Sequence, residues 1–460
     1  MGSDMEIFAD ERLRILADVL EKPLYIVGGY VRNYLIDGTV SRDVDIAAAL
    51  PAEKFCAAAE KCGFSVKCVY KNTSTAVAES GGLRCEYTSF RKDIYEKGGA
   101  HTPVAVIPTD SIEEDAARRD FKCNAVYYDI KNDKTEDVLG GIRDISEKVL
   151  DTVVEPSGVF CADGLRLMRL ARFAGELGFR PTADVLAAAQ SNAALIKDIA
   201  VERVFDELKK TLVADTKYAF SPADGHYAGL KILSETGVLD YIIPELTAGR
   251  NMPQRADFHR YDVLEHTFRT VLYAPPKIRL AALFHDVGKP FCMINYGKFK
   301  GHDKAGTEIA RDVLSRLKAD GKTVREIVFL TGAHMKDLAG DMRAAKIRVF
   351  MAENSEFTED LLALKQADYR AGKDATGTSP TVKKWLDILN EMKKEGAPFR
   401  VKDLKISARE LENMGFKGKR LGEELKVLFR AAVAEPYLND SARLKALAEK
   451  DFVRLMETEN

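Results

Sequence analysis

Two aspartates stand two positions apart where a polar stretch meets an apolar run. They are Asp43 and Asp45 in SRDVDIAAAL, residues 41–50. In a strand, side chains alternate between faces, so both carboxylates point the same way, about 6–7 Å apart. Such a pair is costly to bury, but it can hold Mg²⁺ together with substrate phosphates. Two such ions promote in-line phosphoryl or nucleotidyl transfer. Taken alone, the pair is also typical of a solvated turn.

A glycine pair precedes the aspartates in YIVGGYVRNYL, residues 25–35, between an expected strand and an expected helix. Helix N-termini bind phosphate through free N–H groups and the helix dipole. Gly28 and Gly29 are therefore candidate phosphate-binding residues, and Arg32 follows one turn later. A tight turn explains the glycines equally well in isolation. Glu86 is a candidate third carboxylate, although a surface strand glutamate is the simpler interpretation.

Acidic and basic residues recur every three positions in ADGLRLMRLARF, residues 162–173. Asp163, Arg166, Arg169 and Arg172 share one slowly rotating stripe of a helix. A solvated basic face is one interpretation. Another is base recognition, because an aspartate accepts hydrogen bonds and an arginine only donates them. Cytosine and adenine present an amino donor beside a ring acceptor, whereas guanine and uracil reverse this pattern. One Asp–Arg pair could thus select C and A.

These segments resemble class II CCA-adding enzymes and their bacterial poly(A) polymerase relatives. The similarity covers LYIVGGYVRNYL with SRDVDIA, the RRDFKCNA element at residues 118–125, and the DGLRLMRLARF element at residues 163–173. It extends to the tail LKISARELENMGFKGKRLGEELKVLF, residues 404–429, which resembles a tRNA-contacting segment of that family.

The resemblance implies roles for individual residues. Asp43 and Asp45 would be catalytic and bind Mg²⁺. The triphosphate would be held by Gly29, Arg32 and Arg119, with Asp120 and Asn124 near the ribose. Asp163 and Arg166 would read the base, supported by Arg169 and Arg172. Two departures stand out: Ala162 replaces a common glutamate, and SARE (Ser407 to Glu410) replaces a common Gly-Lys-Asp core.

Five of the seven histidines fall within residues 259–334. His285 and Asp286 are adjacent in an apolar segment, where an unliganded pair would be costly to desolvate. Mixed His and Asp ligands suit Mn²⁺, Fe, Ni²⁺, Zn²⁺ or Mg²⁺. The pattern resembles the HD phosphohydrolase domain, which implies the ligands His266, His285, Asp286 and Asp368. His302 and His334 are candidates for a second metal or a phosphate. The alternative is a structural HD-like domain with an idle metal site.

The elements that must position these residues change in character along the chain. Strands are predicted for LYIV, VDIAAAL, LRCEYTSF, VAVIP and AVYYDI, with helices at residues 9–20, 30–38 and 52–63. From about residue 155, helical patterns dominate. SRDVD and DATGTSP are predicted loops. The expected class is α+β: a nucleotidyltransferase α/β head with a mixed sheet, then a long all-α region with an HD domain. The expected domains are the head (residues 1–152), a base-recognising neck (153–250), the HD domain (251–375) and a tRNA-binding tail (376–460).

Composition narrows the class of protein. The net charge is −2, so RNA contacts must come from local patches, such as residues 298–304 and 417–420. The seven cysteines form no CxxC motif, which fits a reduced cytoplasmic location. The sequence contains no run of 18 apolar residues, which is about the length that a membrane-spanning helix requires.

The expected activity is template-independent addition of C, C and A to tRNA 3′ ends from CTP and ATP, with Mg²⁺ at the head. Alternatives within the same class are a poly(A) polymerase and an enzyme that adds only CC or only A. An HD phosphohydrolase with a nucleotide-binding head is the alternative of another class.

Overall fold

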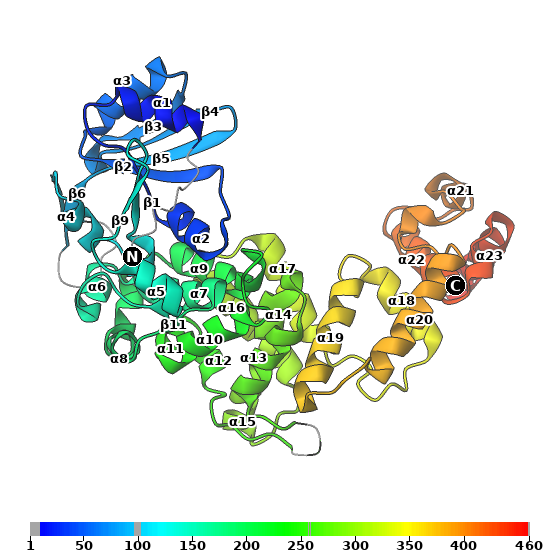
Figure 1. Cartoon of the computed structure of the whole chain (residues 1–460). Helices are drawn as coiled ribbons and strands as arrows, with labels where there is room; N and C mark the ends of the chain where they lie inside the picture. The colour runs from blue at the N-terminus through cyan, green and yellow to red at the C-terminus, as the bar shows by residue number, and fades with distance from the viewer. Residues whose placement is uncertain (1–9, 96–102, 256, 258, 459–460) are drawn as a thin grey trace. The chain divides into compact units, whose positions relative to one another are not determined.

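A seven-stranded mixed sheet organises the N-terminal part of the computed structural model (Figure 1). Its strand order is β3-β4-β5-β2-β1-β8-β9. Only β2 and β5 pair in parallel; the other neighbours are antiparallel. The strands are β1 (Tyr25–Val27), β2 (Asp43–Ala48), β3 (Ser65–Tyr70), β4 (Thr75–Ser80), β5 (Leu83–Ser89), β8 (Tyr127–Asp129) and β9 (Lys134–Glu136).

The structure describes residues 10–95, 103–255, 257 and 259–458. The chain divides into two units, each described here by itself. The N-terminal unit runs to Thr247 and includes Arg316–Ala319, and the C-terminal unit contains the remainder. In the described part of the chain, no helix has the length and apolar character needed to cross a membrane.

The alternating burial along β2 determines on which face of the sheet its two aspartates lie. Val44 and Ile46 are buried, whereas Asp43 and Asp45, which alternate with them, are exposed on the opposite face. The two-residue period of a strand therefore fixes which side the carboxylates occupy. The strand begins at Asp43, so the predicted loop SRDVD extends only to Arg42.

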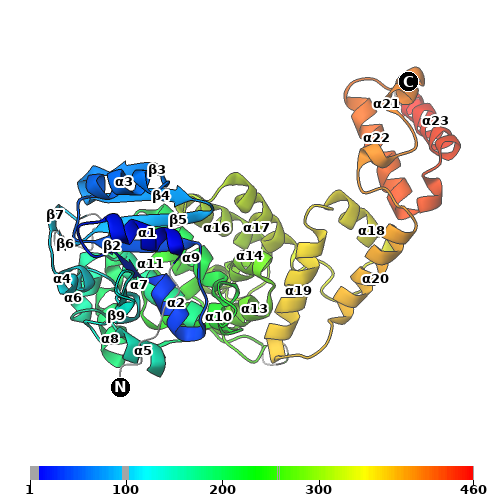
Figure 2. The ribbon, with the colours of Figure 1, turned by 45° about the horizontal axis from the view of Figure 1, so that its top comes forward.

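Helices flank the sheet in the N-terminal unit. Helices α1 and α3 lie side by side, and α3 packs on β3, β4 and β5 (Figures 1 and 2). The helices of this region are α1 (Glu11–Val19), α2 (Gly29–Asp37), α3 (Ala52–Lys61), α4 (Ile112–Ala117) and α5 (Gly141–Glu147). Two short ladders complete it: β6 (Arg91–Ile94) with β7 (Ala105–Pro108), and β10 (Val149–Leu150) with β11 (Arg180–Pro181).

A helical region follows β10 and closes the N-terminal unit. Helix α7 is buried along almost its whole length and packs against α9 and α10. The helices are α6 (Pro156–Ala162), α7 (Leu165–Leu177), α8 (Ala183–Asn192), α9 (Val201–Leu212), α10 (Gly225–Glu235), α11 (Val238–Ile242) and α12 (Pro244–Thr247).

The described residues of the C-terminal unit form helices joined by loops and contain no strand. Helix α13 packs against α14 and α19, and α17 packs against α14 and α19. Helices α18, α20 and α22 continue the chain toward the C-terminus (Figure 2). The helices are α13 (Val263–Tyr273), α14 (Arg279–Phe284), α15 (Gly288–Tyr296), α16 (His302–Arg316), α17 (Gly321–Ala333), α18 (Ala344–Glu353), α19 (Thr358–Lys373), α20 (Pro380–Lys394), α21 (Ala408–Asn413), α22 (Lys419–Ala434) and α23 (Ser441–Thr458).

The predicted class, a mixed-sheet head followed by a helical region, is confirmed. The sequence did not predict β3, β4, β6, β9, β10 or β11. Strands β3 (SVKCVY) and β4 (TAVAES) each contain at most three consecutive apolar residues, fewer than the run of about four to eight that marks a buried strand.

Candidate active site and metal centre

A pocket of about 630 Å³ opens in the N-terminal unit. Seven arginines but only four aspartates line it, an excess of positive charge that suits an anionic ligand. Ten predicted site residues meet there: Gly28, Gly29, Arg32, Asp45, Arg119, Asp120, Asn124, Asp163, Arg166 and Arg169. The other lining residues are Thr73, Arg91, Asp93, Tyr95, Pro103, Arg118, Leu165, Phe173, Arg203 and Tyr218. Of the predicted set, Asp43 and Arg172 do not line it.

Gly28 lies directly against Asp45. Strand β1 pairs with β2 so that Val27 is opposite Asp45, and the chain then turns into α2 through Gly28 at φ 78°. A Cβ atom on Gly28 would lie 3.0 Å from Asp45 Oδ2. Both the positive φ and this close approach require glycine. The glycine pair and the aspartate, 17 residues apart in the sequence, thus form one corner of the pocket.

Three carboxylates share the exposed face of β2 and β5. The parallel register places Asp43 beside Arg84 and Asp45 beside Glu86. Loss of surrounding water raises the pKa of Asp45; Arg119 lowers it, and the nearby charge of Glu86 raises it. A bound cation would favour the ionised form instead. The third carboxylate therefore lies where the sequence suggested, although Glu86 also pairs with Arg84 at 2.7 Å.

Arg32 is buried, and its hydrogen-bonding partners are neutral. Its guanidinium donates to Asn33 Oδ1 at 2.9 Å and to Tyr218 Oη at 3.1 Å, and it also donates to Asn124 Oδ1. Among the described residues, no carboxylate forms an ion pair with it. A buried cation without a counter-ion is costly, so this guanidinium is well suited to bind a phosphate group.

Arg119 is held by a buried carboxylate that the sequence analysis did not single out. Arg119 donates to Asp115 Oδ2 at 3.0 Å and to Tyr127 Oη at 2.9 Å. Asp115 also accepts from Arg118 at 2.7 Å. Burial alone would raise the pKa of Asp115, but Arg119 and Arg118 lower it below its usual value. The spacing of three and four residues along a helix was the signal available in the sequence.

Asp120 connects the sheet region of the N-terminal unit to helix α7. Its carboxylate accepts from Arg169 Nε at 2.8 Å and from Asn124 Nδ2 at 3.0 Å. Burial acts to raise the pKa of Asp120, but Arg169 and Asn124 hold it well below the usual range. The residues predicted to lie near the ribose are therefore tied to the arginine helix α7.

Asp163 and Arg166 both line the pocket at the start of α7. Asp163 Oδ1 accepts from the backbone of Leu165 at 3.0 Å, and Arg166 donates to the carbonyls of Val159 and Arg118. Two backbone carbonyls thus orient Arg166 in a chain that has Ala162 where the resemblance leads one to expect a glutamate.

Arg172, predicted to support the base-reading pair, lies outside the pocket. Its buried guanidinium pairs with Glu176 at 2.9 Å and also with Glu207. The helix carries its fourth stripe position away from the pocket and into the helical core. Arg172 also lies over the ring of Phe173, which contacts the pocket residues Arg32 and Arg169 as well.

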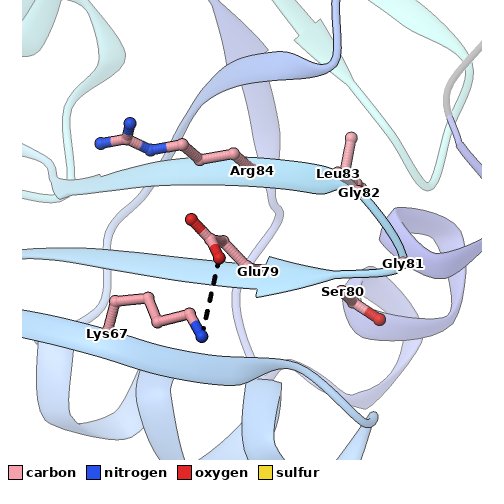
Figure 3. Close-up of a pocket in the computed structure, with 7 residues that line it drawn as sticks. All are labelled: Lys67, Glu79, Ser80, Gly81, Gly82, Leu83 and Arg84. Carbon is pink, nitrogen blue, oxygen red and sulfur yellow. Dashed lines mark ion pairs between the residues drawn. The ribbon is translucent and has the colours of Figure 1, made fainter.

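A second, shallower pocket of about 400 Å³ lies at the β4–β5 hairpin (Figure 3). It is lined by Lys67, Glu79, Ser80, Gly81, Gly82, Leu83 and Arg84. Glu79 already pairs with Lys67 at 3.6 Å. With this single ion pair and a glycine turn, it has no set of converging charges comparable to the larger pocket.

The predicted metal ligands meet in the C-terminal unit. His266 Nε2 lies 3.0 Å from Asp368 Oδ1, and His285 Nε2 lies 3.1 Å from Asp286 Oδ2. Two of these buried nitrogen atoms, His266 Nε2 and His285 Nε2, lack a hydrogen bond, whereas Asp286 Oδ2 forms an ion pair with Lys289 at 2.6 Å. Buried polar atoms without partners are rare. This donor set fits a divalent ion.

Backbone carbonyls orient the imidazoles. His285 Nδ1 lies 2.7 Å from the carbonyl of Ala282, which can only accept, so Nδ1 carries the hydrogen and Nε2 presents a lone pair to the cluster. His259, which was not predicted as a ligand, packs its ring edge-on against His266 at 4.6 Å. Burial lowers the pKa of His259 to about 4, which keeps it neutral.

The chain matches three family models in order. They are the poly A polymerase head domain at residues 24–151, a probable RNA and SrmB-binding site of polymerase A at residues 178–249, and the HD domain at residues 263–372.

Similar proteins carry related names. An A-adding tRNA nucleotidyltransferase of Deinococcus radiodurans is 34% identical over 57% of this chain and 61% of its own length, so the match spans less than two thirds of that relative. A CCA-adding enzyme of Geobacillus thermodenitrificans is 32% identical over 67% of this chain and 70% of its own length.

Among solved structures, the fold is similar to the crystal structure of the Bacillus stearothermophilus CCA-adding enzyme in complex with CTP. The TM-score is 0.67 at 23% identity, covering 98% of this chain and 100% of that one. This likeness concerns the fold. Together with the sequence matches, it places the chain in the family of CCA-adding tRNA nucleotidyltransferases and poly(A) polymerases, a family of enzymes, here with an HD domain.

Proposed function

We propose that this protein adds C, C and A to the 3′ ends of tRNA from CTP and ATP without a nucleic-acid template. The observation that supports it most strongly is the arginine-rich pocket with Asp45 at one corner and Asp163 and Arg166 at the start of α7. The arginines there suit an anionic triphosphate, Asp45 suits a metal ion, and Asp163 with Arg166 suits recognition of the base.

The pocket residues have different proposed roles, which follow from the chemistry of their side chains. Arg32 and Arg119 bind the triphosphate, because both guanidiniums are held in fixed positions by hydrogen bonds. Asp120 and Asn124 lie near the ribose. Mg²⁺ held by Asp43 and Asp45 would activate the attacking 3′-hydroxyl and stabilise the leaving pyrophosphate by a two-metal mechanism. Positioning and charge stabilisation supply most of the rate enhancement.

Base choice belongs to Asp163 and Arg166. Both are buried against the pocket wall, and Arg166 is oriented by backbone carbonyls. Fixed groups of this kind accept from an amino group and donate to a ring nitrogen, which cytosine and adenine allow. Arg169 supports the pair through Asp120.

tRNA is proposed to contact exposed basic residues outside the pocket. Lys417, Lys419 and Arg420 are exposed near the start of α22. Lys298, Lys300 and Lys304 are exposed near the start of α16, although His302 among them is buried. Ser407 and Glu410 form a capping box at the start of α21, so the departure SARE has a local structural role.

Three tRNA substrates separate full CCA addition from its alternatives. They end at the discriminator base, after C and after CC, and each is incubated with Mg²⁺ and each nucleotide singly and together. Addition of C, C and then A, followed by a stop, supports the proposal. Addition of A only or CC only indicates a specialised enzyme, and long A tails indicate a poly(A) polymerase. No addition with any nucleotide contradicts the proposal.

Phosphohydrolysis by the HD domain is a second candidate function, favoured by the converging His266, His285, Asp286 and Asp368. These residues would hold a divalent ion, which would activate water for attack on a terminal or cyclic phosphate. Hydrolysis of p-nitrophenyl phosphate and of 2′,3′-cyclic nucleotides tests this candidate. Activity that is lost in Asp286→Asn supports it, and absence of hydrolysis with every divalent ion contradicts it.

A further inference from the structure

Tyr218 lies in the connection between α9 and α10 and lines the nucleotide pocket beside Arg32. Its hydroxyl oxygen accepts a hydrogen bond from Arg32 Nη2 at 3.1 Å. The two residues are 186 positions apart in the sequence, so only the folded chain brings them together. The helical region thus supplies a polar group to the part of the pocket that Arg32 forms.

Local hydrogen bonds fix the position of Tyr218. Its backbone N–H donates to Ser221 Oγ at 3.1 Å, and its carbonyl accepts from the backbone N–H of Ser221 at 3.1 Å. Ser221 Oγ in turn donates to the carbonyl of Glu176, in the last turn of α7, at 2.7 Å. Because the connection is tied to α7 in this way, Tyr218 is already in place before a ligand binds, which lowers the entropy cost of binding.

The ring of Tyr218 is occupied by other contacts. It stacks on the ring of Phe220, with centroids 4.9 Å apart and an angle of 13° between the planes. The guanidinium carbon of Arg32 lies 5.8 Å from the centroid of the Tyr218 ring, and Lys217 Nζ lies 5.7 Å from it. The hydroxyl is therefore the part of this half-buried side chain that is best placed to contact a ligand in the pocket.

The hydroxyl of Tyr218 also has a hydrogen to donate. A phenol can accept one hydrogen bond and donate another at the same time, whereas a guanidinium only donates. Arg32 therefore cannot accept the hydrogen of the hydroxyl to which it donates. Among the residues that the structure describes, none accepts a hydrogen bond from Tyr218 Oη. This hydrogen is available to an acceptor atom on a ligand.

The groups around the hydroxyl favour an anionic oxygen as that acceptor. A Cβ atom on Gly29 would lie 3.6 Å from Arg32 Nη2, so the start of α2, Arg32 and Tyr218 converge on one place. Backbone N–H groups at the start of a helix and a guanidinium with neutral partners both attract negative charge. An oxygen that accepts from Arg32 Nη2 lies within reach of Tyr218 Oη, because these two atoms are 3.1 Å apart.

We propose that Tyr218 binds the triphosphate of CTP and ATP, donating its hydroxyl hydrogen to a phosphate oxygen that Arg32 also contacts. The inference rests on the proposed nucleotide transfer for the identity of the ligand, and it adds a residue of the helical region to the binding site. Both nucleotides carry the same triphosphate, so this contact contributes equally to both and takes no part in the choice of base. A hydrogen bond to a charged group is stronger than one between neutral groups.

Tyr218→Phe tests the proposal, because it removes the hydroxyl and keeps the ring that stacks on Phe220. Binding is measured by isothermal titration calorimetry on the full-length protein, without tRNA and without divalent cations. The affinities for CTP and ATP should fall by the same factor, about tenfold or more. Tyr241→Phe is the matched control, because Tyr241 is an exposed tyrosine of α11 outside the pocket, and it should bind both nucleotides like wild type. Unchanged affinity in Tyr218→Phe overturns the proposal.

Two further ligands distinguish a contact with the triphosphate from a contact with the ribose. dCTP lacks the 2′-hydroxyl, and inorganic tripolyphosphate lacks the nucleoside altogether. Tyr218→Phe should lose as much affinity for dCTP as for CTP, and the inhibition constant of tripolyphosphate against CTP binding should rise about tenfold. A loss confined to CTP, or the same inhibition constant in both proteins, overturns the proposal.

The same measurements separate this inference from the proposed function. If wild type binds neither CTP nor ATP, both the proposed function and this inference fail. If wild type extends tRNA and Tyr218→Phe binds CTP as tightly as wild type, this inference alone fails.

Discussion

At the scale of single residues, Arg32 and Arg172 show how two buried arginines on one ring serve different purposes. Both lie over the ring of Phe173, with the guanidinium carbon 5.3 Å from the ring centroid for Arg32 and 4.2 Å for Arg172. Arg172 has two carboxylate partners, whereas Arg32 has only neutral ones. Because its partners are neutral, the charge of Arg32 is available to a ligand. The charge of Arg172 is already neutralised by two carboxylates, and its pair with Glu207 joins helices α7 and α9.

Exchange of these arginines for lysine tests that difference. Arg32→Lys should weaken binding of CTP and ATP about 10–100-fold, because lysine lacks the planar fork that contacts several oxygens at once. Arg172→Lys should lower the free energy of unfolding by about 1–3 kcal/mol with little effect on nucleotide affinity. Isothermal titration calorimetry and urea denaturation measure the two effects. Equal loss of nucleotide affinity in both variants would contradict the assignment.

At the scale of elements, helix α2 is bounded by two glycines with the same positive φ but different ψ, −140° at Gly28 and 7° at Gly38. Gly28 and Gly38 both have φ 78°. A Cβ on Gly28 would meet Asp45, whereas a Cβ on Gly38 would have no atom within 4 Å. Gly38 is therefore a control for alanine at a positive φ, whereas Gly28 combines a conformation restricted to glycine with the contact to the carboxylate.

Alanine at these two positions measures the contact. Gly38→Ala should cost about 1–2 kcal/mol of stability and leave nucleotide transfer unchanged. Gly28→Ala should carry a larger backbone cost, because φ 78° with ψ −140° is accessible essentially to glycine alone, and it should also displace Asp45, so the rate of transfer should fall at least about tenfold. The comparison uses thermal denaturation and single-turnover transfer at one temperature. Similar transfer rates in the two variants would show that the approach of Gly28 to Asp45 has no functional role.

Helix α22 carries a buried acid whose titration affects stability. Burial, and then Asp451, raise the pKa of Glu424 to about 7. Because the folded state binds this proton more tightly than the unfolded state, stability is greatest below the unfolded pKa of about 4.5 and falls as the pH rises toward 7.

Glu424→Gln should remove that loss. The variant should be more stable than wild type at pH 8 by roughly 1–2 kcal/mol, a value that allows for screening by solvent. The two proteins should converge near pH 4.5. Urea denaturation at several pH values measures this dependence, and parallel curves for the two proteins would be incompatible with a raised pKa.

At the scale of the whole molecule, the two sites lie in separate units of the chain. The nucleotide pocket is built from residues 28–218, and the metal cluster from residues 259–368. No residue contributes to both. Nucleotide transfer and any hydrolysis should therefore be separable by mutation.

Asp286→Asn tests this independence. It should abolish metal retention in the HD domain and leave CCA addition unchanged, because Asp286 does not line the nucleotide pocket. tRNA extension and metal content are measured on the same preparation. Parallel loss of both would indicate that the two units are functionally coupled.

The sequence predicted much of this organisation, and the failures have physical causes. Asp45 and Asp163 could be recognised because spacing reports which face of a strand or helix a residue occupies. Arg172 lies outside the pocket because the same spacing rotates the stripe, so the fourth position reaches the core. Asp115, Phe173 and Tyr218 were missed because their roles depend on contacts that only the folded chain creates. The exposed strand β3 was missed because its apolar residues neither alternate strictly nor form a run of at least about four.

The most direct test of the nucleotide pocket is the rate of single-nucleotide addition by Asp45→Asn. The assay uses the tRNA end and nucleotide on which wild type is most active. Glu79→Gln serves as the control, because Glu79 lies in the same sheet but outside the pocket and pairs with Lys67. The rate should fall at least about 100-fold in Asp45→Asn and remain unchanged in Glu79→Gln. Addition by Asp45→Asn at the wild-type rate, or no addition by wild type at any tRNA end, would contradict the account.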